Sequence, residues 1–412
     1  MGDDDNVQTK RRNQTRRSRT RHGNRRQNDT VSTQSVPETA ANNPTPILPD
    51  EIISEILVRV PVRSLLQFRC VCKSWKTLIS DPHFAKNQLQ LSTEYPQLFS
   101  HYFSRVQWKI ISYDVESLLE NQSIRSNPIE PYTFTMMQNY QVIGSCNGLL
   151  CLYDLRQCYV VLWNPCLNLK SKRSPTTMNL YGDFENISYH GFGYDQENDK
   201  YKVLLTVYNF MKYGKSVALI FTSGAKSWKK IKNLPCDLDN FRFDACSGRF
   251  VSGTLNWIVK KYINSDEEAI ISFDVKNETY GEVLLPQLDG DNISNLMLDV
   301  VSNCLCLCFD YKETESVVWV MKEYGVAESW TKLIIIPHMT FTSRRRWNVT
   351  MWPIFIDTSF PSEIGAVLVN TMRSKLVLYN ICKDRTRHPK ISSMILIDEL
   401  QIYHESLITP RW

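Results

Sequence analysis

The chain has 412 residues, and its 48 Lys and Arg against 43 Asp and Glu give a formal net charge of +5. This length allows one large domain with smaller ones beside it. No apolar run approaches the roughly 18 residues that a membrane helix needs, and no signal-peptide pattern opens the chain. We therefore expect neither a membrane partner nor secretion.

The positive charge is concentrated at the N-terminus. Residues 1–30 contain nine basic and four acidic residues, so this segment alone accounts for the excess of +5. It has almost no apolar residues, which predicts disorder, and residues 31–46 contain three prolines typical of a linker. We assign 1–46 to a disordered basic tail and linker. Its clusters, such as Lys10-Arg11-Arg12, suggest a nuclear-import signal or a phosphate-binding arm, and a solvated tail without either role is the alternative.

A helical pattern begins directly after this linker. Pro49 suits the first position of a helix, and Asp50 and Glu51 place negative charge at its positive end. Apolar residues then recur at helical spacing: Ile52, Ile53, Ile56, Leu57 and Val60. Pro61 cannot continue the helix, so we expect it to end there.

A second apolar set follows and leads into a short last helix. Its members are Leu65, Leu66, Phe68, Val71, Cys72, Trp75, Leu78 and Ile79. Asp81-Pro82 then begins a helix that carries Phe84. We predict three short helices in about forty residues, a size that cannot bury this much apolar surface alone. Part of the surface should therefore bind another protein.

These residues resemble the F-box, in its plant form, by which substrate receptors of SCF-type ubiquitin ligases bind a Skp-family adaptor. The resemblance rests on the Leu48–Glu51 opening, the hinge of residues 59–66 (Arg-Val-Pro-Val-Arg-Ser-Leu-Leu) and residues 68–75 (Phe-Arg-Cys-Val-Cys-Lys-Ser-Trp). It implies an F-box at 47–90 whose adaptor-binding residues are Leu48, Pro49, Ile56, Leu57, Leu65, Leu66, Val71, Cys72 and Trp75. The alternative is a helical hairpin belonging to the core of the following domain.

After about residue 95 the pattern changes to short extended segments. Segments such as Val160–Trp163, Val217–Phe221 and Ile270–Phe273 are rich in β-branched and aromatic residues, which is typical of strands. Turns such as Asn147-Gly148 separate them. The pattern predicts an antiparallel all-β domain.

This domain contains a repeat. Residues 227–235 parallel residues 329–337, with a related segment at 279–286 between them, and each ends in Pro. With the proline at 175, the prolines are spaced by 60, 51 and 51 residues. A period near fifty favours kelch-type blades, about six in all, in a β-propeller; a two-sheet β-sandwich is the alternative. Trp228 and Trp330 should then be buried at equivalent places, with Pro235 and Pro337 ending outer strands.

The repeats also resemble the F-box-associated domain of plant F-box proteins. Three segments fall in that family's order: Gly144–Cys151, Gly191–Asp195 and Val251–Trp257. Asn256 departs from the family, which more often has His or Tyr there, and the double glycine of true kelch repeats is absent. The resemblance implies that 95–412 is a kelch-like substrate domain. Residues 95–140 and 338–412 fit only loosely, which leaves the closure of the ring open.

No catalytic arrangement is recognisable in the sequence. It lacks a phosphate-binding glycine loop, a Gly-x-Ser-x-Gly elbow and a His-Glu-x-x-His helix, and its seven histidines are scattered. We predict a protein that is not an enzyme and has no catalytic residue, cofactor or metal. A copper oxidase propeller is the enzyme alternative, but no cluster identifies its ligands. Cys304, Cys306 and Cys308 alternate, so in a strand they share one face, where we expect small buried hydrophobes rather than metal ligands.

One loop stands out in the second half of the domain. Arg344, Arg345, Arg346 and Trp347 combine residue types that are enriched in binding hot spots. We hypothesise that they bind a protein substrate, for example an acidic or phosphorylated segment. A solvated basic turn with Trp347 in the core is the alternative.

These observations predict a non-catalytic substrate-recognition subunit of an SCF-type ubiquitin ligase. Its F-box would bind a Skp-family adaptor and, through it, a cullin scaffold, while the β domain recruits an unidentified protein target in the nucleus or cytoplasm. The alternative is a nuclear nucleic-acid or chromatin-binding protein that uses the basic arm. The electrical balance of residues 31–412, with 39 charges of each sign, makes nucleic-acid binding the weaker interpretation.

Overall fold

The structure is a computed structural model that describes most of residues 48–412. The segments outside the described part are 1–47, 92–95, 105–106, 115–131, 137–139, 178–185, 210–214, 236–245, 262–266, 289–292, 313, 338–351, 356–365, 372–374, 381–384 and 388–398. Among the described residues, no helix is both long and apolar enough to cross a bilayer.

Four helices precede the β domain: α1 (Asp50–Leu57), α2 (Val62–Phe68), α3 (Lys73–Ile79) and α4 (Pro82–Leu91). We call them the helical module. Pro49 and Pro61 are the N-cap residues of α1 and α2. The predicted helical module is present, and it has four helices where three were expected because the second apolar set is divided at Cys72. Cys72 is extended and caps α3, with its Sγ accepting a hydrogen bond from the Trp75 backbone N–H at 3.5 Å.

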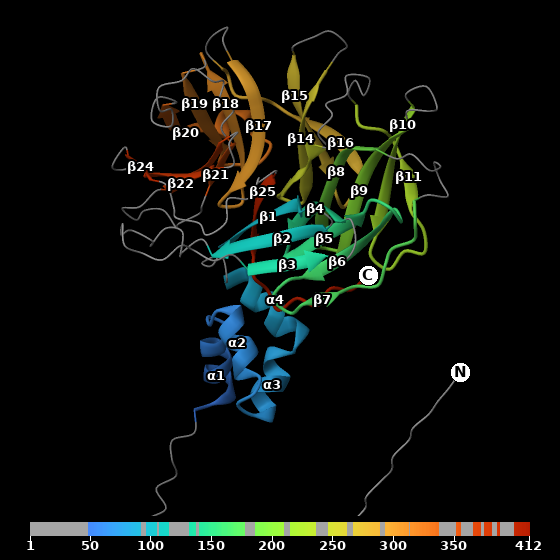
Figure 1. Ribbon diagram of the computed structural model, residues 1–412, viewed down its shortest axis with the longest axis vertical. Coiled ribbons are helices and arrows are strands. Elements are labelled where there is room, and N and C mark those ends of the chain that lie inside the picture. Colours follow the sequence, from blue (N-terminus) through green and yellow to red (C-terminus); the bar gives the residue numbers. More distant parts are fainter. Residues whose placement is uncertain are drawn as a thin grey trace, which may run out of the picture. The chain divides into compact units, whose positions relative to one another are not determined.

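Six sheets make up the β domain in the described residues (Figure 1). The first contains β1 (Pro96–Ser104), β2 (Gln107–Asp114), β3 (Tyr132–Met136) and the C-terminal β25 (Glu399–His404). The second contains β4 (Tyr140–Cys146), β5 (Leu149–Asp154), β6 (Tyr159–Asn164) and β7 (Leu169–Lys170). The third contains β8 (Asn186–Asp195), β9 (Lys200–Asn209), β10 (Lys215–Thr222), β11 (Lys229–Ile231) and β12 (Cys246–Ser247).

The remaining three sheets complete the domain. They are β13 (Arg249–Val251), β14 (Thr254–Lys260), β15 (Glu268–Asp274) and β16 (Thr279–Val283); β17 (Ile293–Val301), β18 (Cys304–Tyr311), β19 (Glu315–Met321) and β20 (Trp330–Pro337); and β21 (Trp352–Phe355), β22 (Ala366–Thr371), β23 (Lys375–Asn380) and β24 (Arg385–Arg387). Strands that follow each other within a sheet pair antiparallel, except for the two-residue β12, which lies beside β8 and pairs with it in parallel. The predicted antiparallel β-propeller is confirmed, and the two-sheet sandwich is not observed.

The ring closes by pairing the two ends of the domain. β25 lies antiparallel to β1, with His404 opposite Pro96 and Glu399 opposite His101 (Figure 1). The first sheet therefore takes three strands from the start of the domain and one from its end. This pairing closes the ring at the point where the chain enters and leaves the domain.

Two tryptophans mark the repeat at equivalent places, as predicted. Trp228 and Trp330 are each only 7% exposed. The indole N–H of Trp228 donates to the Pro175 carbonyl at 2.7 Å, and that of Trp330 donates to the Leu284 carbonyl at 2.9 Å. Each acceptor follows the outer strand of the preceding sheet, so each indole joins two neighbouring sheets. Pro337 ends β20 as expected, whereas Pro235 lies beyond the end of β11.

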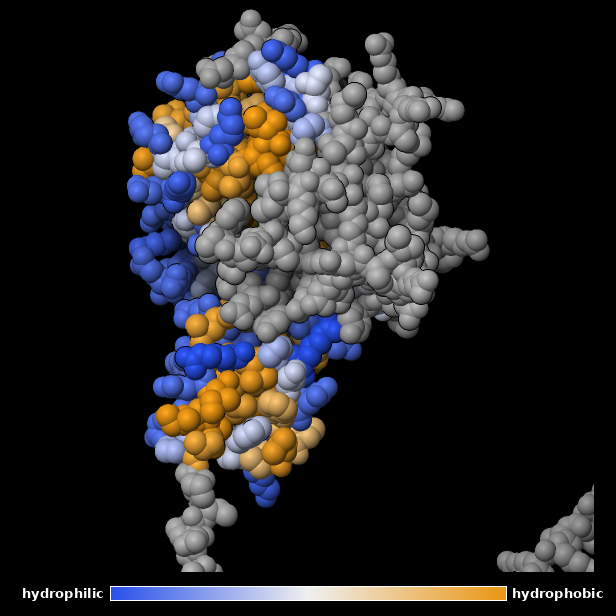
Figure 2. Space-filling view, turned by 90° about the vertical axis from the view of Figure 1, so that its left-hand side faces the viewer, coloured by the Kyte–Doolittle hydropathy of each residue, from blue (hydrophilic) through white to orange (hydrophobic). Residues whose placement is uncertain are grey.

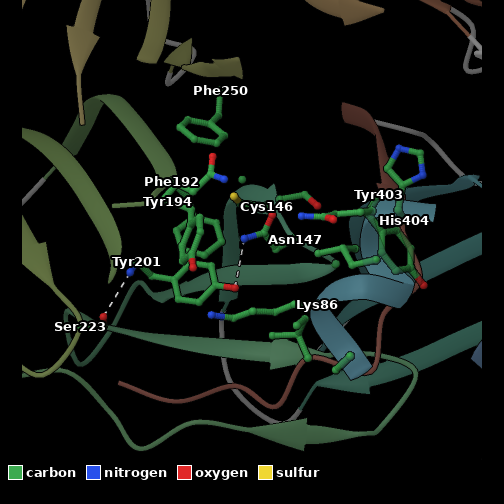
Figure 3. Close-up of a pocket in the computed structure, with 18 of the residues that line it drawn as sticks. Lys86, Cys146, Asn147, Phe192, Tyr194, Tyr201, Ser223, Phe250, Tyr403 and His404 are labelled. Atoms are coloured by element: carbon green, nitrogen blue, oxygen red, sulfur yellow. Dashed lines mark hydrogen bonds between the residues drawn. The ribbon is translucent and has the colours of Figure 1, made fainter. Parts of the chain in front are cut away.

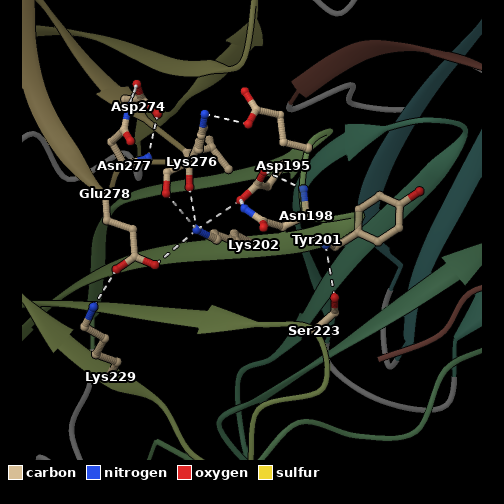
Figure 4. Close-up of polar contacts among 12 residues, drawn as sticks. Asp195, Asn198, Tyr201, Lys202, Ser223, Lys229, Asp274, Lys276, Asn277 and Glu278 are labelled. Atoms are coloured by element: carbon tan, nitrogen blue, oxygen red, sulfur yellow. Dashed lines mark hydrogen bonds and ion pairs between the residues drawn. The ribbon is translucent and has the colours of Figure 1, made fainter.

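A buried lysine joins the third and fourth sheets (Figure 4). Lys202 on β9 is 6% exposed. Its Nζ donates to the Val275 carbonyl at 2.6 Å and to Glu278 Oε1 at 3.1 Å, and lies 3.5 Å from Asp195 Oδ2. Because Val275 and Glu278 belong to the β15–β16 turn, this ammonium group bridges two sheets. Glu278 also pairs with Lys229 at 2.7 Å.

The alternating cysteines of β18 contribute to the packing. Cys306 and Cys308 are buried free thiols, and Cys304 is partly exposed. Burial raises the pKa of the Cys306 and Cys308 thiols, which keeps them protonated and suits the predicted use as small hydrophobes. Among the described residues, no group of three or more His, Cys, Asp or Glu side chains is placed to hold a metal ion.

Candidate functional site

The helical module leaves large apolar side chains in contact with solvent. Ile52 is 41% exposed, Ile56 51% and Val71 63%. Ile52 and Ile56 lie one turn apart on the same side of α1, and Val71 lies between α2 and α3. Figure 2 shows apolar residues gathered on the surface of the helical module. We call Ile52, Ile56 and Val71 the exposed apolar group; single exposed apolar residues are ordinary, but several in one small module indicate a binding surface.

The structure distributes the predicted adaptor-binding residues over three environments. Exposed residues are Leu48, Pro49, Ile56, Val71 and Cys72; partly buried ones are Leu66 and Trp75; buried ones are Leu57 and Leu65. Leu57 and Leu65 are 2% and 0% exposed and pack with Val62, Ile79 and Phe84. We therefore reassign Leu57 and Leu65 from the docking surface to the core of the module.

Ile52 is a surface residue that sequence reasoning did not select. The apolar positions of α1 spread too widely around the helix to show which of them face inward. Only the packing of α1 against its neighbours separates Leu57, which is buried, from Ile52 and Ile56, which are exposed. The sequence showed that the module has more apolar residues than it can bury, but it did not show which of these residues would be exposed.

The turn between α2 and α3 is held by an aromatic pair and a cysteine cap. The rings of Phe68 and Trp75 are 5.6 Å apart and tilted by 56°. The pKa of the Cys72 thiol lies below its usual value because hydrogen bonds with the Ser74 hydroxyl and the Trp75 backbone N–H stabilise the thiolate. These contacts fix the backbone that presents Val71 to solvent.

A cavity of about 1250 Å³ lies where α4 meets the turns of the β domain (Figure 3). Tyr201 in its wall accepts a hydrogen bond from Asn147 Nδ2 at 3.3 Å and stacks on Phe192 with ring centroids 5.5 Å apart. Lys86 of α4 reaches Asp199 at 3.0 Å. Burial raises the pKa of the Cys146 thiol well beyond its usual value, so this cysteine is a poor nucleophile. The described walls thus show packing and polar contacts without an activated nucleophile.

The basic loop predicted to bind a substrate cannot be placed. Arg344, Arg345, Arg346 and Trp347 lie outside the described residues. The same holds for the basic tail of residues 1–30. Both stay predictions.

The structure thus combines a small helical module that exposes apolar side chains with a closed β-propeller, an organisation that fits a protein which binds partners through two separate parts. Family models agree with this organisation: a model of the F-box domain matches residues 46–87, and a model of the F-box associated beta propeller domain matches residues 101–409. The chain belongs to the family of F-box proteins with an F-box-associated β-propeller domain.

Relatives from Arabidopsis thaliana share this organisation. The chain is 30% identical over 372 residues to "F-box/kelch-repeat protein At3g23880", covering 88% of this chain and 96% of that protein. It is 29% identical over 308 residues to "F-box protein At3g07870", covering 69% and 71%, respectively. It is 24% identical over 360 residues to "F-box protein CPR1", covering 81% and 82%.

This combination of domains is that of a substrate-recognition adaptor of SCF-type ubiquitin ligases. Proteins with these two domains are typically non-catalytic. The F-box implies binding to a Skp-family adaptor.

Proposed function

We propose that the exposed apolar group of the helical module binds a Skp-family adaptor and, through it, a cullin scaffold, while the β domain holds a protein target for ubiquitin transfer. The observation that supports this best is the exposure of Ile56 and Val71, 51% and 63%, on a module whose core is otherwise filled. The chain contributes proximity: it raises the effective concentration of a target beside a conjugating enzyme.

The expected size of the docking contribution follows from apolar burial. Covering an Ile or Val side chain contributes roughly 1.5–3 kcal/mol, and each 1.4 kcal/mol changes a dissociation constant about tenfold. A charge placed at one of these positions would also have to be desolvated. Ile56→Asp and Val71→Asp should therefore each weaken adaptor binding by roughly 100-fold or more.

The test is titration calorimetry of the purified chain with a Skp-family adaptor. Leu155→Asp is the matched control, because Leu155 is 44% exposed in the β5–β6 turn of the propeller. We expect this control to bind as wild type, and all three variants to keep the wild-type melting temperature. Wild-type affinity in both Ile56→Asp and Val71→Asp would refute the proposed docking surface.

For the target, we propose recognition by Arg344–Arg346 and Trp347, with preference for an acidic or phosphorylated segment. Trp347→Ala should leave thermal stability unchanged and reduce target capture. Proximity labelling in cells with the Ile56→Asp variant, which should retain targets without passing them on, would identify candidates. If Trp347→Ala unfolds the domain, Trp347 is a core residue and this part of the proposal fails. We further propose residence in the nucleus or cytoplasm, which imaging of a tagged chain would test.

A further inference from the structure

The last eight residues of the chain are held firmly in the fold, although chain ends are usually loose. We call residues 405–412, which follow β25, the C-terminal strap. Glu405, Ser406, Leu407 and Pro410 are buried. Four buried residues in one segment of eight indicate that the segment has specific contacts in the fold.

On its propeller side the C-terminal strap is held by the second sheet. Asn164 at the end of β6 is fully buried, and its Nδ2 donates to the carbonyls of Ser406 and Ile408, both at 2.9 Å. Gly148 in the β4–β5 turn has φ +70°, and a Cβ there would collide with Ser406 Oγ and lie only 2.6 Å from the His404 carbonyl oxygen. The approach is so close that only glycine fits.

The end of the strap is also anchored. The ring of Trp412 meets that of Phe221 edge to face, with centroids 5.0 Å apart. Trp412 and Ile408 pack against the apolar core shared by the second and third sheets. The strap is thus fixed to the propeller on both sides of Leu407.

Leu407 completes the core of the helical module. It is 6% exposed and packs in one cluster with Leu57, Leu65 and Phe84. Ile408 contacts this cluster as well as the propeller core. The interior of the module therefore includes a side chain that belongs to the far end of the chain.

An ion pair supports the same junction. Both Nε and a terminal nitrogen of Arg63 on α2 contact Glu405 Oε1, at 2.8 and 2.7 Å. The Glu405 side chain is 8% exposed, whereas that of Arg63 is 42% exposed. A carboxylate buried to this degree needs a charged partner, and the helical module supplies it. By contrast, Lys86 and Asp199 are 48% and 65% exposed, so their contact contributes little.

We propose that the C-terminal strap is a positioning element that fixes the direction of the helical module relative to the propeller. The consequence for ubiquitin transfer rests on the proposed function: a target on the propeller would be held at a defined place relative to the docked conjugating enzyme. Leu407 and Glu405 are positioning residues in this sense, and they do not contact the target or the reacting atoms.

The first test measures the geometry of the full-length chain. Spin labels are attached through unnatural amino acids at Lys76 on α3 and Lys226 near β11, both exposed, and their distance distribution is recorded. Leu407→Ala should at least double the width of the distribution, while Thr409→Ala, an exposed position in the same strap, should not. Asn164→Ala is the second variant, because it removes the two hydrogen bonds to the strap carbonyls while Asn164 itself is not part of the core cluster of the helical module. Wild-type widths in both Leu407→Ala and Asn164→Ala would overturn the proposal.

The second test uses the assembled ligase with a conjugating enzyme and ubiquitin, and maps by mass spectrometry which lysines of the chain itself are modified. The wild type should show a restricted set and Asn164→Ala a broader one at equal adaptor affinity. If a variant with a broadened distance distribution showed the same set of modified lysines as the wild type, the positioning role of the C-terminal strap would be overturned. If the wild-type chain does not bind the adaptor, the proposed function fails, whereas the distance measurement still decides whether the strap fixes the module.

Discussion

The helical module and the second sheet of the propeller differ in how completely they bury their apolar side chains. In the sheet, β5 and β6 are buried along their whole length. In the module, α1 and α3 each bury a single residue, Leu57 and Ile79. Yet α1 alone leaves Ile52 and Ile56 more than 40% exposed. The sheet thus buries its apolar surface within itself, whereas the module leaves part of its apolar surface exposed and includes Leu407, from the other end of the sequence, in its core.

The largest effects should come from the tryptophans that join neighbouring sheets. Trp228→Ala and Trp330→Ala should each lower the free energy of unfolding by about 3–5 kcal/mol, because each removes a large buried side chain. Thermal denaturation will measure this. Trp→Phe at the same positions keeps most of the volume and loses the hydrogen bond to Pro175 or Leu284, so it should cost less. Wild-type melting of the two alanine variants would mean that the sheets do not depend on these contacts.

Within the helical module, two apolar positions should behave differently. Leu65→Ala removes a fully buried side chain and should destabilise the module by about 2–4 kcal/mol. Val71→Ala, at a residue 63% exposed, should leave stability nearly unchanged and weaken adaptor binding about tenfold. Urea denaturation measures the loss of stability in each variant, and calorimetric titration measures the loss of adaptor affinity. Equal loss of stability in both variants would contradict the division into core and docking surface.

A smaller effect is expected where polar groups join the sheets. Lys202→Met leaves the carboxylates of Asp195 and Glu278 without their buried partner, which should cost roughly 2–3 kcal/mol at neutral pH. Lys229→Met is the matched control, because the Lys229 side chain is 68% exposed, and it should cost less than about 1 kcal/mol. If the two variants lost the same free energy of unfolding, burial of Lys202 would not increase its contribution to stability.

The same site predicts a dependence on pH. Burial alone would raise the pKa of the Asp195 carboxyl, but hydrogen bonds from Asn198 and the Lys202 ammonium outweigh it and the pKa is lowered. For Glu278, burial is likewise outweighed by Lys229 and Lys202, and its pKa is lowered. A lowered pKa gives stability that is present above the unfolded value of about 4 and is lost as pH falls through the folded value. The difference between wild type and Lys202→Met should therefore shrink between pH 7 and pH 3, as measured by urea denaturation at several pH values.

Deletion of residues 1–36 should have the smallest effect. Its composition leaves this segment almost nothing to bury, so melting temperature and adaptor affinity should equal those of the full chain. A shift of the protein from nucleus to cytoplasm would identify the basic clusters as an import signal. Salt-sensitive binding of nucleic acid by the full chain, absent from the deletion, would instead favour the nucleic-acid function.

The sequence predicted those parts of the fold that depend on local pattern. Proline-delimited helices, the alternation of Cys304, Cys306 and Cys308, and the equivalence of Trp228 and Trp330 all reflect periodicity within one segment. These patterns do not require knowledge of distant contacts. They were sufficient to predict helices followed by a propeller.

What the sequence did not predict depends on contacts between distant segments. The closure of the ring by β25 and β1 joins residues about 300 positions apart. The inward direction of Leu57 and Leu65 follows from packing with Leu407, which no local period reveals. For the same reason the predicted docking residues, which stay a prediction, included Leu57 and Leu65, two residues that the structure buries in the core of the module.

The burial of Leu407 in the helical module makes the packing of this early segment depend on residues that are synthesised much later. Arg63 and Leu57 are made early, but their partners Glu405 and Leu407 are added 342 and 350 residues later, which takes roughly 20–70 s at typical elongation rates. Nascent chains stopped before residue 399 should therefore bind the adaptor more weakly than full-length chains, as pull-down of stalled ribosome complexes can measure. A chain stopped before residue 399 lacks both β25, which closes the ring by pairing with β1, and Leu407, which packs in the core of the helical module.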